Sequence, residues 1–126
     1  MHKSKLAGFI IDCETDDLDA AATFWSGALG MPLRRLPGAE GEKYVRLDDP
    51  REALHVEVQK VGHPSRVHLD IETDDVHAEV QRLENLGAVP VDVRQNWTVM
   101  QAPTGQRFCV VKMSSTHFSR DANEWT

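Results

Sequence analysis

Hydrophobic and polar residues along this chain alternate in two ways, one with a period of two and one with helical spacing. Alternation with a period of two, which is typical of half-buried strands, occurs at residues 9–14, 43–49, 53–60 and 66–72. A weak strand followed by a loop is predicted between residues 31 and 41. Further strands are predicted near residues 89–93, 96–102 and 106–112, with a hairpin turn at residues 103–105.

Helical spacing appears twice, and each time it follows an acidic turn. In the first helix the apolar positions are Leu18, Ala21, Ala22, Trp25 and Leu29, and in the second they are Val76, Val80, Leu83 and Leu86. The preceding Thr-Asp-Asp runs supply N-cap side chains, which accept hydrogen bonds from the unpaired amides of a first helical turn. Gly30 and Gly87 are typical helix stops.

The acidic stretch is one half of an internal repeat. Residues 12–17 read DCETDD and residues 70–75 read DIETDD, 58 residues further along the chain. This repeat predicts two βαβββ modules, at about residues 6–61 and 64–113, in one domain that spans residues 1–126. Neither module is large enough to bury both faces of its sheet, so we expect an α+β fold in which they pack side by side, with helices outside and a curved mixed sheet around a cavity.

The last stretch, residues 114–126, is polar and has no period, so it is predicted to be disordered. Phe118 and Trp125 leave an alternative open, in which the tail packs on a groove or on a partner subunit.

Composition narrows the function classes. A chain of 126 residues has the length of one domain, and its 14 basic and 20 acidic residues give a net charge of −6, which argues against nucleic acid as a partner. No apolar run is long enough to span a membrane and the first residues lack a secretory signal pattern, so a cytoplasmic location without membrane attachment is expected. Cys13 and Cys109 show neither a disulfide framework nor a zinc-finger spacing.

Alternation also predicts which side chains face a cavity. Successive side chains of a strand point to opposite faces, and the apolar set must face the helices. Val67, Leu69 and Ile71 are therefore predicted to pack under a helix, as are Leu54, Val56 and Val58. The opposite face then receives a polar set, which consists of His55, Glu57, Gln59, His68, Asp70 and Glu72.

Three segments, together with the duplicated module, resemble the vicinal oxygen chelate superfamily, which includes glyoxalase I and the bleomycin-resistance proteins. The run DDLDAAATFWSGALGM is similar to the family's first helix, and APTGQRFCVV is similar to its closing turn and strand. The FW pair, the HLD strand and the FCVV ending most resemble its glyoxalase-like subgroup. The resemblance covers about residues 8–113.

Metal-dependent members of this superfamily take ligands from the first and last strands of each module. Carried onto this chain, these positions are Ile10, Glu57 or a same-face neighbour, His68 and Cys109. Ile10 cannot bind a metal and Cys109 replaces a carboxylate, which would favour a soft metal. The resemblance therefore implies an incomplete metal site, with His68 and Glu57 as its ligands if Zn, Ni, Mn or Fe binds.

Three functions stay open at this stage. The leading hypothesis is a glyoxalase-like protein that binds a small organic ligand in a pocket lined by His55, Gln59, Asp70, Trp97 and Cys109. The second is a metal-dependent lyase, isomerase or ring-cleaving dioxygenase in which Glu57 and His68 are catalytic. The third is a drug-binding protein of the bleomycin-resistance kind. The resemblance also implies a homodimer.

Overall fold

Two aspartates of the repeated acidic stretches start the two main helices. Helix α1 (Leu18–Leu29) begins after Asp17, whose carboxylate accepts the Ala20 N–H at 3.0 Å. Helix α2 (Val76–Asn85) begins in the same way after Asp75, which accepts the Ala78 N–H at 3.0 Å. The N-cap role predicted from sequence is therefore confirmed at both helices.

The computed structural model describes residues 1–126, which form two compact units. We call residues 8–67 the β1–β4 unit, and residues 1–7 with 68–126 the β5–β8 unit. Each unit holds one copy of the predicted βαβββ module, and the α+β fold class is confirmed. No helix in the chain is long and apolar enough to cross a membrane.

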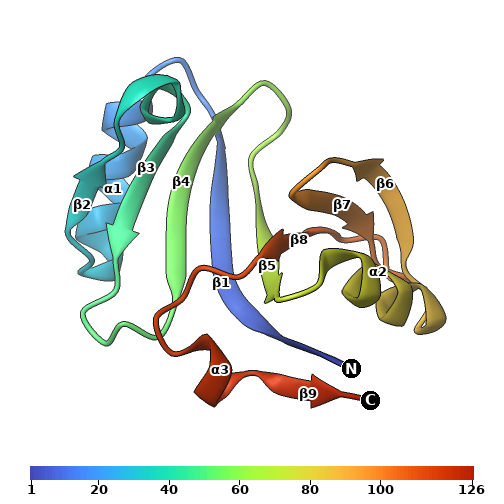
Figure 1. The fold of residues 1–126 in the computed structure, drawn as a ribbon. Helices are drawn as coiled ribbons and strands as arrows, with labels where there is room; N and C mark the ends of the chain where they lie inside the picture. Colours follow the sequence, from blue (N-terminus) through green and yellow to red (C-terminus); the bar gives the residue numbers. More distant parts are fainter. The chain divides into compact units, whose positions relative to one another are not determined.

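In the β1–β4 unit the strand order is β2-β3-β4-β1 (Figure 1). The strands are β1 (His2–Glu14), β2 (Leu33–Arg35), β3 (Tyr44–Asp48) and β4 (His55–Val61), and a 3-10 turn, η1 (Gly38–Glu42), precedes β3. Strand β4 runs parallel to β1 and antiparallel to β3. Gly8 of β1 lies opposite His55, and a Cβ atom at Gly8 would stand 1.9 Å from the His55 carbonyl oxygen, so only glycine fits there.

The core of this unit lies between the strands and α1. Leu47, Val56 and Val58 are fully buried, as alternation predicted for the two valines. Partly buried side chains from β1, α1, β2 and the adjoining loops pack against them, including Phe9, Cys13, Leu18, Trp25 and Leu54. The apolar faces of β4 and α1 are therefore the ones that meet, and the polar residues of β4 are left on the other face of the sheet.

In the β5–β8 unit the strand order is β5-β8-β7-β6. These strands are β5 (Arg66–Thr73), β6 (Val89–Val93), β7 (Trp97–Gln101) and β8 (Arg107–Lys112), and β5 runs parallel to β8. Met100, Val110 and Leu83 form the buried core, against which Ile71, Val76, Val80 and Phe108 pack. Helix α2 supplies the other side of this core, which fixes one face of β5 and β8 as apolar.

The C-terminal residues are ordered, so the predicted disorder of the tail is wrong. They form α3 (Phe118–Asp121) and β9 (Asn123–Trp125), and β9 pairs antiparallel with His2–Ser4 of β1. Phe118 is 2% exposed. This pairing also explains why β1 begins at His2 and not at Phe9, because backbone hydrogen bonds to β9 extend the strand beyond its apolar stretch.

The predicted burial of β5 is only partly correct. Ile71 packs in the core beneath α2, but Val67 and Leu69 are 58% and 51% exposed. The core beneath α2 reaches only the C-terminal part of β5. Ile71 packs against this core, whereas Val67 and Leu69, nearer the start of the strand, do not.

Candidate functional site

The candidate site is built on β5 and β8 of the β5–β8 unit. His68 and Asp70 are two residues apart on β5, so their side chains leave the same face of the strand. Asp70 is aligned with Cys109 on the neighbouring β8. Because Ile71 and Val110 pack toward α2, these three residues lie on the face turned away from that helix. Alternation predicted this for His68 and Asp70, and the register taken from the family resemblance implied it for Cys109.

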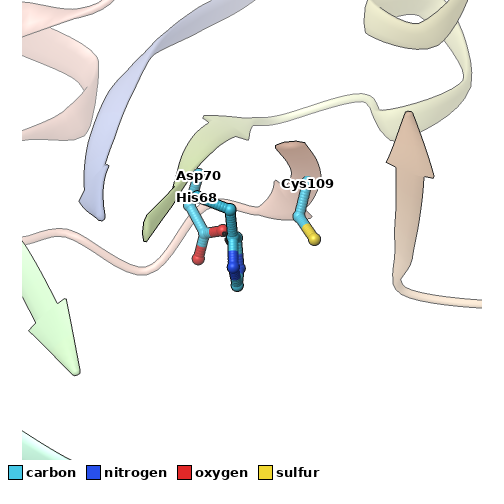
Figure 2. Close-up of side chains that lie close together, drawn as sticks. All are labelled: His68, Asp70 and Cys109. Carbon is cyan, nitrogen blue, oxygen red and sulfur yellow. Dashed lines mark ion pairs between the residues drawn. The ribbon is translucent and has the colours of Figure 1, made fainter. Parts of the chain in front are cut away.

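The three side chains converge. One ligand atom of each residue, a His68 ring nitrogen, an Asp70 carboxylate oxygen and Cys109 Sγ, lies within 4.8 Å of the other two. Figure 2 shows His68, Asp70 and Cys109 projecting together from β5 and β8. His68 Nε2 lies 3.5 Å from Asp70 Oδ1, a distance at which a protonated His68 would form an ion pair, and the two side chains are 12% and 13% exposed. We call these three residues the HDC group.

Asp70 has an unused acceptor. Its Oδ1 atom is buried and has no hydrogen bond, because its distance of 3.5 Å from His68 Nε2 exceeds the usual N–H···O length. A buried carboxylate oxygen without a donor is costly, and such atoms are usually satisfied by water, by an ion or by a ligand. The group is therefore suited to receive an N–H or O–H donor, or a cation.

Trp97 shares this face of the sheet. Val99 is aligned with Cys109 across β7 and β8, and Trp97 is two residues from Val99 on the same strand. Trp97 is 44% exposed, whereas the alternate residues Thr98 and Met100 are buried. An exposed indole therefore lies beside the HDC group. Along the strand direction, Trp97 is two residues, or roughly 7 Å, from the position aligned with Cys109.

The polar residues of β4 form a separate row in the β1–β4 unit. His55 Nε2 lies 2.8 Å from Glu57 Oε1, and Gln59 donates to the Tyr44 hydroxyl at 2.9 Å. Glu57 therefore has an ion-pair partner on its own strand. Its predicted action together with His68, as catalytic residues or metal ligands, stays a prediction.

Two positions change relative to the sequence-based interpretation. Glu72, expected on the polar cavity face, is 2% exposed and accepts the backbone N–H groups of Ser114 and Ser115 at 3.2 and 3.1 Å. These hydrogen bonds hold the start of the tail in place.

Arg46 is a residue of the polar face that the sequence analysis did not name, although alternation in KYVRLDD puts it there. It is aligned with Glu57 on β4, and its buried Nε atom has no hydrogen-bond partner.

A second feature of the β5–β8 unit lies apart from the HDC group. A groove of about 620 Å³ is lined by α2 and by the two ends of the chain. Its lining residues are Met1, His2, His77, Ala78, Gln81, Arg82, Asn85, Glu124, Trp125 and Thr126. None of them belongs to the sheet face that carries Cys109, so this groove is a separate location for a ligand.

Comparisons with known proteins place the fold. A sequence profile described as "Glyoxalase-like domain" matches residues 8–111. The chain is similar in structure to methylmalonyl-CoA epimerase from Mycobacterium tuberculosis, with a TM-score of 0.64, 17% identity and coverage of 86% of this chain and 87% of that one. The comparison with curated proteins gave no match.

Two further solved structures are similar over most of their length. A variant of Streptomyces coelicolor methylmalonyl-CoA epimerase in complex with 2-nitronate-propionyl-CoA has a TM-score of 0.59 and 16% identity, with coverage of 87% and 97%. A hypothetical protein from Bacillus halodurans C-125 has a TM-score of 0.61 and 12% identity, with coverage of 88% and 95%. At these identities the likeness concerns the fold. The profile match over most of the chain shows that this protein belongs to the glyoxalase-like domain family, within the vicinal oxygen chelate superfamily.

Proposed function

We propose that this protein binds a small organic molecule on the sheet face of the β5–β8 unit, with the polar end of the molecule at the HDC group and a flat apolar part against Trp97. The observation that carries the proposal is the buried Asp70 Oδ1 atom without a hydrogen bond. A ligand hydroxyl or amine would satisfy it. Trp97, exposed on the same face, offers the kind of aromatic surface common in small-molecule sites.

One solved neighbour supports a small-molecule role only in general terms. The Streptomyces coelicolor epimerase variant holds a propionyl-CoA derivative, so the fold can present such a ligand. We include an acyl-CoA among the candidate ligands for that reason. The residues that would recognise it here are the HDC group and Trp97.

The Asp70→Asn variant tests this function. We expect isothermal titration with catechol, benzyl alcohol and propionyl-CoA to detect binding of at least one probe. Loss of the negative charge should weaken that binding by about tenfold or more, because a hydrogen bond to a charged group contributes about 1.5–3 kcal/mol. The same variant should unfold at a higher temperature, because it removes a carboxylate charge whose buried Oδ1 atom has no hydrogen bond.

Asp121→Asn is the matched control, since Asp121 pairs with Arg120 at the surface of α3, away from the HDC group. It should leave probe binding unchanged. Equal affinities in the wild type and in Asp70→Asn, together with a lower melting temperature for Asp70→Asn, would assign Asp70 a structural role and contradict the proposal.

A second candidate function is metal binding, which the spacing within the HDC group favours. Nitrogen, oxygen and sulfur donors within 4.8 Å of one another fit Zn²⁺, for which three protein ligands with one open position are usual in catalytic sites. The unused Asp70 oxygen fits this role as well. His68, Asp70 and Cys109 would hold the ion, which would polarise an oxygen atom of the substrate.

Elemental analysis separates the two functions. The leading proposal predicts that protein purified without chelators holds well below one metal ion per chain. It also predicts that EDTA leaves probe binding unchanged. Zinc near one equivalent, lost in both Asp70→Asn and Cys109→Ala but retained in Cys13→Ala, would instead establish the metal site.

A further inference from the structure

We propose that Cys109 adds to the carbonyl carbon of an aldehyde ligand, with His68 as the proton carrier and Asp70 as the acceptor for the hydroxyl group that forms. This inference rests on the proposed function, because it names the class of molecule that the HDC group would receive. It adds a reversible covalent step to what would otherwise be non-covalent binding.

The group has the composition of an activated thiol site. A cysteine, a histidine and a carboxylate lie within 4.8 Å of one another, and the carboxylate oxygen Asp70 Oδ1 lies 3.5 Å from the histidine ring nitrogen. In such constellations the histidine removes the proton of the nucleophile and the carboxylate orients the ring. Separations longer than a hydrogen bond are usual before a ligand binds.

The reaction balances without an oxidant or a metal. The thiol proton of Cys109 passes to His68, and a bond forms between Sγ and the carbonyl carbon. The π electrons of the C=O bond move to the oxygen atom, which then takes the proton from His68. The product is a hemithioacetal, with one new S–C bond and one new O–H bond.

Asp70 favours an aldehyde over other electrophiles. Addition to a carbonyl converts an acceptor oxygen into a hydroxyl donor, and Asp70 Oδ1 is a buried acceptor that lacks a donor. Alkylation of the thiol, or its conjugate addition to an α,β-unsaturated ketone, leaves no new hydroxyl group at the attacked carbon. The aromatic surface of Trp97 further favours an aldehyde with a flat substituent.

Cys13 is a built-in reference for this chemistry. It packs against the apolar core of the β1–β4 unit, and its Sγ donates to the Ile11 carbonyl oxygen at 3.6 Å. Burial raises the pKa of the Cys13 thiol. A partly buried thiol with a raised pKa reacts slowly, because the thiolate is the nucleophile and less of it is present at pH 7.

Carbon-13 NMR with carbonyl-labelled benzaldehyde tests the proposal. Wild type and Cys13→Ala should both convert part of the label from the carbonyl region of the spectrum to the region of oxygen- and sulfur-bonded sp³ carbon. Cys109→Ala should give no such signal. His68→Gln should slow the exchange between free and added aldehyde, and Asp70→Asn should lower the amount of adduct.

Reaction with iodoacetamide, followed by mass spectrometry of peptides, supplies a second measurement. We expect Cys109 to react at least about tenfold faster than Cys13 at pH 7, and benzaldehyde to protect Cys109 only. In His68→Gln the rate at Cys109 should fall, while the rate at Cys13 should stay the same. An unchanged rate at Cys13 also reports that the variant is folded.

The outcomes separate this inference from the proposed function. Binding of catechol or propionyl-CoA that Asp70→Asn weakens, without any adduct signal in the wild type, overturns the covalent step and leaves the binding function in place. An adduct that persists in Cys109→Ala also overturns it. Absence of both adduct and probe binding overturns the two proposals together.

Discussion

Glu79 is a residue whose role could not be read from the sequence. It lies on α2 and is fully buried, although the helical pattern alone would leave it at a polar position. Arg82 donates to both of its carboxylate oxygens at 2.9 and 2.8 Å, and His2 Nε2 lies 2.8 Å from Oε1. Burial alone would raise the pKa of Glu79, but hydrogen bonds from Arg82, His2 and Ser4 outweigh it and hold the pKa below the usual range.

This environment predicts a specific loss of stability in acid. A lowered pKa in the folded state means that Glu79 contributes stability above its unfolded value of about 4.3, and that this contribution is lost as the pH falls through the folded pKa. Glu79→Gln should reduce the free energy of unfolding by about 2–3 kcal/mol at pH 7 and by less below pH 4, since the buried partners lose a charged acceptor. Urea unfolding from pH 3 to pH 7 measures this.

Glu84→Gln is a suitable comparison, because Glu84 lies on the same helix with its side chain exposed. Its free energy of unfolding should follow that of the wild type across the pH range. A loss for Glu79→Gln that is the same at pH 3 and pH 7 would show that the ionised carboxylate is not what stabilises this contact.

The face of a strand on which a residue lies could be predicted from alternation. The hydrogen-bond partners of that residue could not, because they depend on contacts between residues far apart in sequence. Alternation put His68 and Asp70 on one face, because that follows from strand geometry alone. It could not show that Asp70 Oδ1 lacks a donor, since that depends on which groups surround it in space. Glu72 shows the same limit, because its partners are backbone amides more than 40 residues away in sequence.

Among the helices and strands, β9 is the element that the sequence analysis failed to predict, since it lies in the segment expected to be disordered. It has three residues and no alternation of its own, and it forms because β1 offers a partner edge. Trp125 fixes it there: its Nε1 atom donates to Ser4 Oγ at 2.8 Å, and the Arg82 guanidinium lies 3.9 Å from the centroid of its ring. Phe118 and Trp125 were therefore the residues that correctly indicated a packed tail.

Removal of the tail should therefore destabilise the chain. A chain cut after Met113 loses the buried Phe118 as well as Trp125, and deletion of one buried phenylalanine side chain costs about 3–5 kcal/mol. We expect a clear drop in melting temperature, and faster hydrogen exchange at residues 2–4 of β1. A chain with Glu124→Gln, which alters only an exposed side chain of β9, is the control.

The same truncated chain tests whether the tail contributes to the predicted homodimer. Light scattering should give the mass of two chains for the full-length protein. If the tail serves only its own chain, as its contacts with β1 and α2 indicate, the truncated chain should keep that mass as long as it stays folded. A monomeric truncated chain that retains its secondary structure would instead place the tail in the subunit contact.

At the scale of the whole molecule, the internal repeat made the fold predictable. The 58-residue offset gave two βαβββ modules, because the same strand, cap and helix pattern occurs twice and each copy follows the same local rules. The family resemblance added the register of the last strand, which put Cys109 on the same side as His68. Function was less accessible, because it depends on which side chains meet on one face of the sheet, and many chemistries share this fold.

Binding of a small molecule at the HDC group and Trp97 is the proposal on which the function depends. Chemical-shift mapping of ¹⁵N-labelled protein, titrated with catechol, benzyl alcohol and propionyl-CoA, tests it most directly. The largest shifts should occur at residues 68–70, 97–99 and 109–111, and Asp70→Asn should reduce them. Shifts confined to the groove between α2 and β9, around Gln81 and Trp125, would contradict it.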